Sequence, residues 1–166
     1  MEWFPWLLWL HIFGAIVAFG PIFAIPLIGN MGAKEPMHAN FAVRISAMIS
    51  HRLTVPLAIV QGVTGLGIVL VSGRLAHLFE KTNYWLDVAI VLYAIALYTS
   101  IFIQTPRVAK IIEMTSTPPP PPAPGAAPSG PPPALVAEIK TSRQTGMFMT
   151  ALIVTIIFLM VIKPFQ

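Results

Sequence analysis

The chain has 166 residues, of which 56% are hydrophobic and only 10% are charged, whereas ordinary water-soluble domains carry about 25% charged residues. So few charges cannot cover the surface of a soluble fold of this size, and the composition therefore predicts a surface that faces lipid. The net charge of +4 comes from ten scattered Lys and Arg residues, and there is no cysteine, which argues against a nucleic-acid-binding face and excludes disulfides, zinc–thiolate sites and thiol catalysis.

Four apolar segments predict four transmembrane helices within a single integral membrane domain, residues 1–166. A helix needs about 20 mostly apolar residues to cross a bilayer. The expected spans are residues 5–28, 53–71, 84–104 and 146–162. Pro21 and Pro26 lie inside the first span and are expected to kink or end its helix, because proline has no amide N–H to donate. The predicted fold class is an all-α, four-helix transmembrane bundle.

The start of the chain does not look like a cleaved signal peptide. Glu2 stands where a signal peptide carries Lys or Arg, and the first apolar run continues past Phe19, which is longer than a signal core. We therefore expect the first span to be retained.

The distribution of basic residues predicts the orientation. Seven of them flank the first and third loops, and three lie on the other side. Because cytoplasmic loops carry the excess of Lys and Arg, the first and third loops are expected in the cytoplasm and both termini outside a bacterial inner membrane. The seven are Lys34, Arg44, Arg52, Arg107, Lys110, Lys140 and Arg143.

The third loop is rich in proline. Residues 118–133 contain ten of the seventeen prolines, a composition that favours an extended polyproline II conformation. We expect residues 115–134 to form a disordered cytoplasmic loop. The tract is similar to ligands of SH3 and WW domains, and a flexible tether between two helices is the simpler interpretation.

His11 is the first candidate for a functional residue, because a histidine within a span normally faces the bundle interior. It could be an axial ligand of haem b, a proton-handling group, or a buried histidine that is hydrogen-bonded to its neighbours. His51 is the obvious second haem ligand. It lies at the opposite end of the next helix, however, and antiparallel packing would separate the two by about 20 Å. A haem site would then need a ligand from another chain or different helix limits.

Asp87 is the only carboxylate within an expected span. It could bind a proton or a cation, as acids inside membranes often do. The alternative is an interfacial residue stabilised by the N-terminal dipole of the third helix, with Arg74 or Lys81 as an ion-pair partner.

A basic cluster of Arg44, His51 and Arg52 precedes the second span. It could bind an anionic headgroup or haem propionates, or simply anchor the helix at the inner surface. Small residues recur at helix-packing spacing, where they allow close approach of helices, and two polar residues beside them could form hydrogen bonds between helices. These are Gly14, Ala18, Gly62, Gly65, Gly67, Ala96 and Ser100, with Gln61 and Thr64 as the polar pair.

The chain resembles a family of predicted bacterial integral membrane proteins of unknown function with four helices. The resemblance is carried by Leu10-His11-x-x-Gly14, by the stretch from Arg44 to Arg52, and by the run from Pro56 through Gly62 to Gly65. It is more distantly similar to the copper-resistance D-like and di-haem membrane group. That resemblance implies a haem-ligand role for His11 and His51 only.

Three functions are compatible with these patterns. The first is a non-enzymatic accessory or assembly component without a cofactor. The second is a b-type haem-binding or redox-linked protein that uses His11. The third is a small transporter or channel lined by Asp87 and His11. No catalytic motif of a hydrolase or transferase occurs. The expected partners are the lipid bilayer and either another membrane protein or a second copy of the chain, and not nucleic acid.

Overall fold

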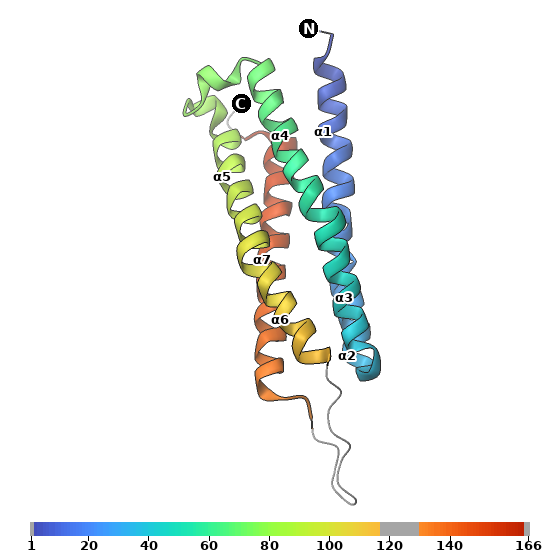
Figure 1. Ribbon diagram of the computed structural model, residues 1–166. Coiled ribbons are helices and arrows are strands. Elements are labelled where there is room, and N and C mark those ends of the chain that lie inside the picture. Colours follow the sequence, from blue (N-terminus) through green and yellow to red (C-terminus); the bar gives the residue numbers. More distant parts are fainter. Residues whose placement is uncertain (1, 117–129, 165–166) are drawn as a thin grey trace, which may run out of the picture.

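The computed structural model describes residues 2–116 and 130–164, and within these residues the chain is helical and contains no strand (Figure 1). Most of the proline tract, residues 117–129, lies outside the described residues, and the expected disordered loop therefore stays a prediction. The all-α fold class is confirmed: four helical runs are long and apolar enough to cross a membrane, at Phe4–Lys34, Ala39–Val71, Lys81–Ser116 and Pro133–Ile162.

Each of the first three runs contains a short 3-10 or π segment. The first run comprises α1 (Phe4–Phe19), the 3-10 turn η1 (Gly20–Phe23) and α2 (Ile25–Lys34). The second run comprises α3 (Ala39–Ile49), the π turn η3 (Ser50–Thr54) and α4 (Val55–Val71). The third run comprises the 3-10 turn η5 (Lys81–Asn83), α5 (Tyr84–Tyr98), the π turn η6 (Thr99–Gln104) and α6 (Thr105–Ser116). The fourth is α7 (Pro133–Ile162), and two further 3-10 turns, η2 (Pro36–His38) and η4 (Arg74–His77), lie between the runs.

The bundle consists of two helical hairpins. In the first, α1 packs along α4 and α2 packs along α3; in the second, α5 and α6 pack along α7. The hairpins meet mainly where α3 contacts α6. Both described chain ends lie at one end of the bundle with the α4–α5 loop, which we call the terminal end, and the opposite end is the α3–α6 end (Figure 1).

Prolines set the irregular turns. As expected, the α-helix of the first run ends at Phe19, and η1 carries Pro21 before α2 resumes with Pro26 in its first turn. Pro56 and Pro106 each lie two residues after a π turn. In both turns the residue before the proline donates its N–H five residues back, from Val55 to Ser50 and from Thr105 to Ser100. The wider turns give room for the proline ring, which in a regular α-helix would clash with the carbonyl group four residues earlier.

Alanines make up much of the core, and many large apolar side chains point outward. Ala18, Ala58 and Ala96 pack with Phe19 and Ile153 where the four runs meet. Some large side chains are buried as well, such as Trp85 at 4% exposure, whereas many others, such as Val161 at 71%, are exposed. This arrangement is the reverse of a water-soluble fold, and it follows when lipid covers the outside and close approach at small residues holds the helices together.

Candidate functional site

His11 lies between α1 and α4, where it contacts the two polar side chains of the second run. Its Nδ1 is 3.0 Å from Thr64 Oγ1, and its Nε2 is 3.1 Å from Gln61 Nε2. Gln61 is 5% exposed and Thr64 is 8% exposed. The hydrogen bonds expected between helices at Gln61 and Thr64 therefore form, and His11 is their common partner.

One tautomer of the imidazole satisfies every contact of this network. When Thr64 Oγ1 donates to the carbonyl oxygen of Gln61 over 3.0 Å, it accepts from His11, and Nδ1 carries the proton. Nε2 then accepts from the amide of Gln61, because a neutral imidazole has one donor and one acceptor nitrogen. The geometry thus describes a neutral histidine that has both nitrogens occupied. The Gln61 oxygen Oε1 is buried without a partner among the described residues.

Glycines allow the two helices to approach at this level. A Cβ on Gly65 would lie 3.0 Å from His11 Cε1, and one on Gly14 would lie 2.8 Å from Gln61 Oε1. On the other side of α4, the Tyr93 hydroxyl of α5 donates to the carbonyl oxygen of Ala58. The polar groups of the bundle interior thus join α1, α4 and α5 to one another.

The hydrogen bonds to both ring nitrogens of His11 affect whether the site can bind a haem. An axial ligand needs a free lone pair on the imidazole, and in this structure the Nε2 lone pair accepts a hydrogen bond from Gln61. His51 is ten residues before Gln61, a separation of about 15 Å along a helix, and it is exposed. No group of three or more metal-ligating side chains occurs in residues 2–116 and 130–164. The residues present do not fit an axially ligated haem without release of Gln61, and the haem site stays a prediction.

Asp87 lies near the terminal end and stabilises the α4–α5 loop. Its Oδ2 accepts a hydrogen bond from the backbone N–H of Phe79 over 2.9 Å, and Phe79 has the left-handed φ of 67°. The expected ion pair with Arg74 or Lys81 is not formed among the described residues. Arg74 instead lies 5.9 Å from the ring centroid of Trp85, a cation–π contact.

The basic cluster lies at the other end of the second run. Arg44, His51 and Arg52 are all exposed, and none of them forms an ion pair within the described residues. Their positions are compatible with contact to lipid headgroups, which stays a prediction.

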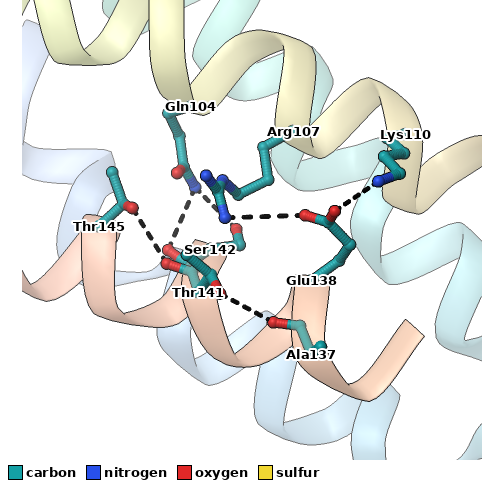
Figure 2. A network of polar contacts seen from close by, with 8 residues as sticks. All are labelled: Gln104, Arg107, Lys110, Ala137, Glu138, Thr141, Ser142 and Thr145. Carbon is teal, nitrogen blue, oxygen red and sulfur yellow. Dashed lines mark hydrogen bonds and ion pairs between the residues drawn. The ribbon is translucent and has the colours of Figure 1, made fainter. Parts of the chain in front are cut away.

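A second polar network joins α6 to α7 near the α3–α6 end (Figure 2). Glu138 accepts a hydrogen bond from Lys110 Nζ over 2.6 Å, and its other oxygen lies 3.7 Å from Arg107. One turn along α7, Ser142 Oγ accepts from Gln104 Nε2 over 2.8 Å. This network ties the third run to the fourth.

Comparison with known proteins identifies the family of the chain. The family model described as "Predicted integral membrane protein (DUF2269)" matches residues 5–164. The chain belongs to this family. A search of curated proteins found no match, and neither did a search of solved structures. As a member of the DUF2269 family, a family of unknown function, the chain is an integral membrane protein with four candidate spans.

Two features of this DUF2269 member were missed from the sequence. Tyr93 carries no local signal, because a tyrosine in an apolar run is ordinary. The Lys110–Glu138 pair joins residues 28 positions apart, and from the sequence the basic residues there indicate only the orientation. Arg107 and Lys110 are three positions apart on one helix face, and this spacing is the signal that could have indicated a shared acidic partner.

The stability of this member is expected to depend on pH through Glu138, which lies in the first two turns of α7, outside the expected span 146–162. The hydrogen bond from Lys110 lowers the pKa of the Glu138 carboxyl below its ordinary value of 4.5. A lowered pKa stabilises the fold above pH 4.5, and this contribution is lost as the pH falls through the lowered pKa. Melting temperatures measured between pH 7 and about pH 3 should therefore fall more for the native chain than for Glu138→Gln. Parallel curves for the two proteins would contradict this prediction.

Proposed function

We propose that the chain is a non-enzymatic component of a bacterial inner membrane, acting as an accessory or assembly subunit. The observation that supports this proposal best is that α4 occupies both ring nitrogens of His11. The imidazole in the bundle interior thus joins two helices. Tyr93 uses its hydroxyl in the same way between α5 and α4. His11 and Tyr93 thus use their polar groups to join helices, and the outward faces are apolar and suit lipid or another membrane helix.

The proposal includes an orientation with both termini outside. It is supported by the seven basic residues that flank the α3–α6 end, against Arg74, Lys81 and Lys163 on the opposite side. Trp3, Trp6 and Trp85 lie at the terminal end, and tryptophan favours the membrane interface. The proline-rich loop would then lie in the cytoplasm.

An absorption spectrum tests the proposal against the haem alternative. The full-length chain is purified in detergent from cells supplied with a haem precursor and measured in the oxidised and reduced states. We expect no Soret band from the native chain or from His11→Gln. A Soret band that disappears in His11→Ala would overturn the non-enzymatic, cofactor-free assignment.

An assembly role also predicts that the chain is part of a larger complex in native membranes. When native membranes are solubilised in a mild detergent, the chain should migrate in a discrete complex larger than the chain produced alone. Migration at the same size in both preparations would contradict an assembly role while leaving the spectrum as an independent result.

A further inference from the structure

Helix length places Arg107 at the depth of the lipid headgroups. Asp87 and Arg107 are twenty positions apart in one helical run without a charged residue between them, which corresponds to about 30 Å at 1.5 Å per residue. The hydrocarbon core of a bilayer is also about 30 Å thick. Arg143, in the fourth run, and Lys163, which directly follows it, are likewise twenty positions apart without a charged residue between them. Both helices thus place a basic residue at the headgroup level of the α3–α6 end.

A shallow groove opens at this level between α6 and α7. It has a volume of 340 Å³ and is lined by Phe102, Ile103, Pro106, Arg107, Lys110 and Glu138. This volume is comparable to that of the smallest sites for small ligands, about 300 Å³. The apolar lining residues precede Arg107 along the run and therefore lie on the hydrocarbon side, where Phe102 is 64% exposed. The charged lining residues lie on the aqueous side.

Arg107 has donors that the protein does not use. Its Nη1 is 3.7 Å from Glu138, beyond hydrogen-bond distance, and its Nε is buried without a partner in the described part of the chain. A guanidinium carries five N–H donors in a planar fork that matches phosphate oxygens. Lys110, whose side chain is 58% exposed, donates to Glu138 and has further donors to offer. The charged side of the groove therefore carries one more cation than anions.

We propose that this groove binds the phosphate headgroup of an anionic phospholipid, with Arg107 and Lys110 on the phosphate and an acyl chain along Phe102 and Ile103. The apolar side of the groove, which continues into the hydrocarbon, favours a lipid over a free anion. Glu138 contacts both cations (Figure 2), so that a bound phosphate would compete with its carboxylate. The site is distinct from the exposed cluster of Arg44, His51 and Arg52, and does not depend on the proposed function.

Native mass spectrometry tests the proposal. The full-length chain is released from nanodiscs that contain equal amounts of phosphatidylglycerol and phosphatidylcholine, and the lipids that remain bound are counted. We expect phosphatidylglycerol to be enriched about fivefold, which corresponds to one basic side chain near an anionic surface. Arg107→Gln should bring the ratio close to that supplied, and Glu138→Gln should raise it above that of the native chain, because it removes the competing carboxylate.

Lys140→Gln is the matched control. It removes a positive charge two residues from Glu138 on α7, but Lys140 does not line the groove, and the enrichment should stay as in the native chain. Lys110→Gln replaces Arg107→Gln if the latter does not give a helical, monodisperse protein. The proposal is overturned if the native chain shows no enrichment of phosphatidylglycerol, or if neither Arg107→Gln nor Lys110→Gln reduces that enrichment. It is also overturned if Lys140→Gln reduces the enrichment as much as these variants do.

A separate arm distinguishes a lipid from a free anion. Inorganic phosphate is added to the chain in nanodiscs of phosphatidylcholine alone, and the melting temperature is measured. We expect no change. A stabilisation that Arg107→Gln abolishes would assign the groove to a free anion and overturn the lipid assignment.

Discussion

Replacing His11 with alanine is expected to lower the free energy of unfolding by about 2–4 kcal/mol. The change removes both hydrogen bonds between α1 and α4 and leaves the amide of Gln61 and the hydroxyl of Thr64 without their partner. Hydrogen bonds between transmembrane helices contribute about 0.6 kcal/mol on average and up to about 1.7 kcal/mol. The cavity left by the imidazole adds to this loss. Reversible unfolding of the purified chain in mixed micelles measures the effect.

His38→Ala is the matched control for this measurement. The imidazole of His38 is 64% exposed, and within residues 2–116 and 130–164 its one ion pair is a 3.6 Å contact with Glu35. An exposed pair of this kind contributes about 0–1 kcal/mol. The structural role of His11 would be refuted if the two alanine variants unfolded at the same denaturant concentration.

Replacing Gly32 with alanine is expected to destabilise the first hairpin by about 1–3 kcal/mol. Gly32 lies in α2 against α3, and a Cβ there would lie 2.7 Å from the Ala42 Cβ and 3.5 Å from the Ala39 Cα. Neither atom belongs to a flexible side chain, so that the helices must move apart. The unfolding measurement used for His11 detects this change.

Gly29→Ala provides the comparison within the same helix. A Cβ on Gly29 would meet nothing within 4 Å, and the substitution should leave the free energy of unfolding unchanged or raise it by up to about 1 kcal/mol, because alanine favours a helix more than glycine does. Equal destabilisation by both substitutions would show that the loss comes from glycine as a residue type and not from the contact between α2 and α3.

The four-helix fold could be predicted from the sequence because its signals are local. A run of about 20 apolar residues between charges needs no knowledge of its neighbours, and the break at Pro21 follows from the missing N–H of that residue alone. The π turns before Pro56 and Pro106 were not predicted. Proline indicates that a helix is disturbed, but a kink, a 3-10 turn and a wider turn all accommodate the ring.

The contacts of the candidate site were only partly predictable. His11, Gln61 and Thr64 were each singled out, but their meeting depends on the vertical register of α1 against α4. That register is determined where Gly14 and Gly65 let the helices approach, which is a pairwise property that one chain's periodicity does not contain.

Asp87 shows the same limit at the terminal end. The sequence suggests a basic partner for it, and the structure gives a backbone N–H, that of Phe79. This bond depends on the conformation of a loop that hydrophobic periodicity does not describe.

The core of alanines reverses the usual relation between residue size and tolerance to substitution. In a water-soluble protein, large buried residues tolerate few substitutions, whereas exposed residues tolerate many. Here the outer residues, such as Ile16 and Val161, can be exchanged for any side chain that lipid accepts. Ala18 and Ala89, at 0% and 1% exposure, are enclosed by neighbouring helices, where a larger side chain costs overpacking. The chain is therefore expected to diverge fastest at its lipid-facing side chains and slowest at its buried positions, which include Ala18, Ala89 and Trp85.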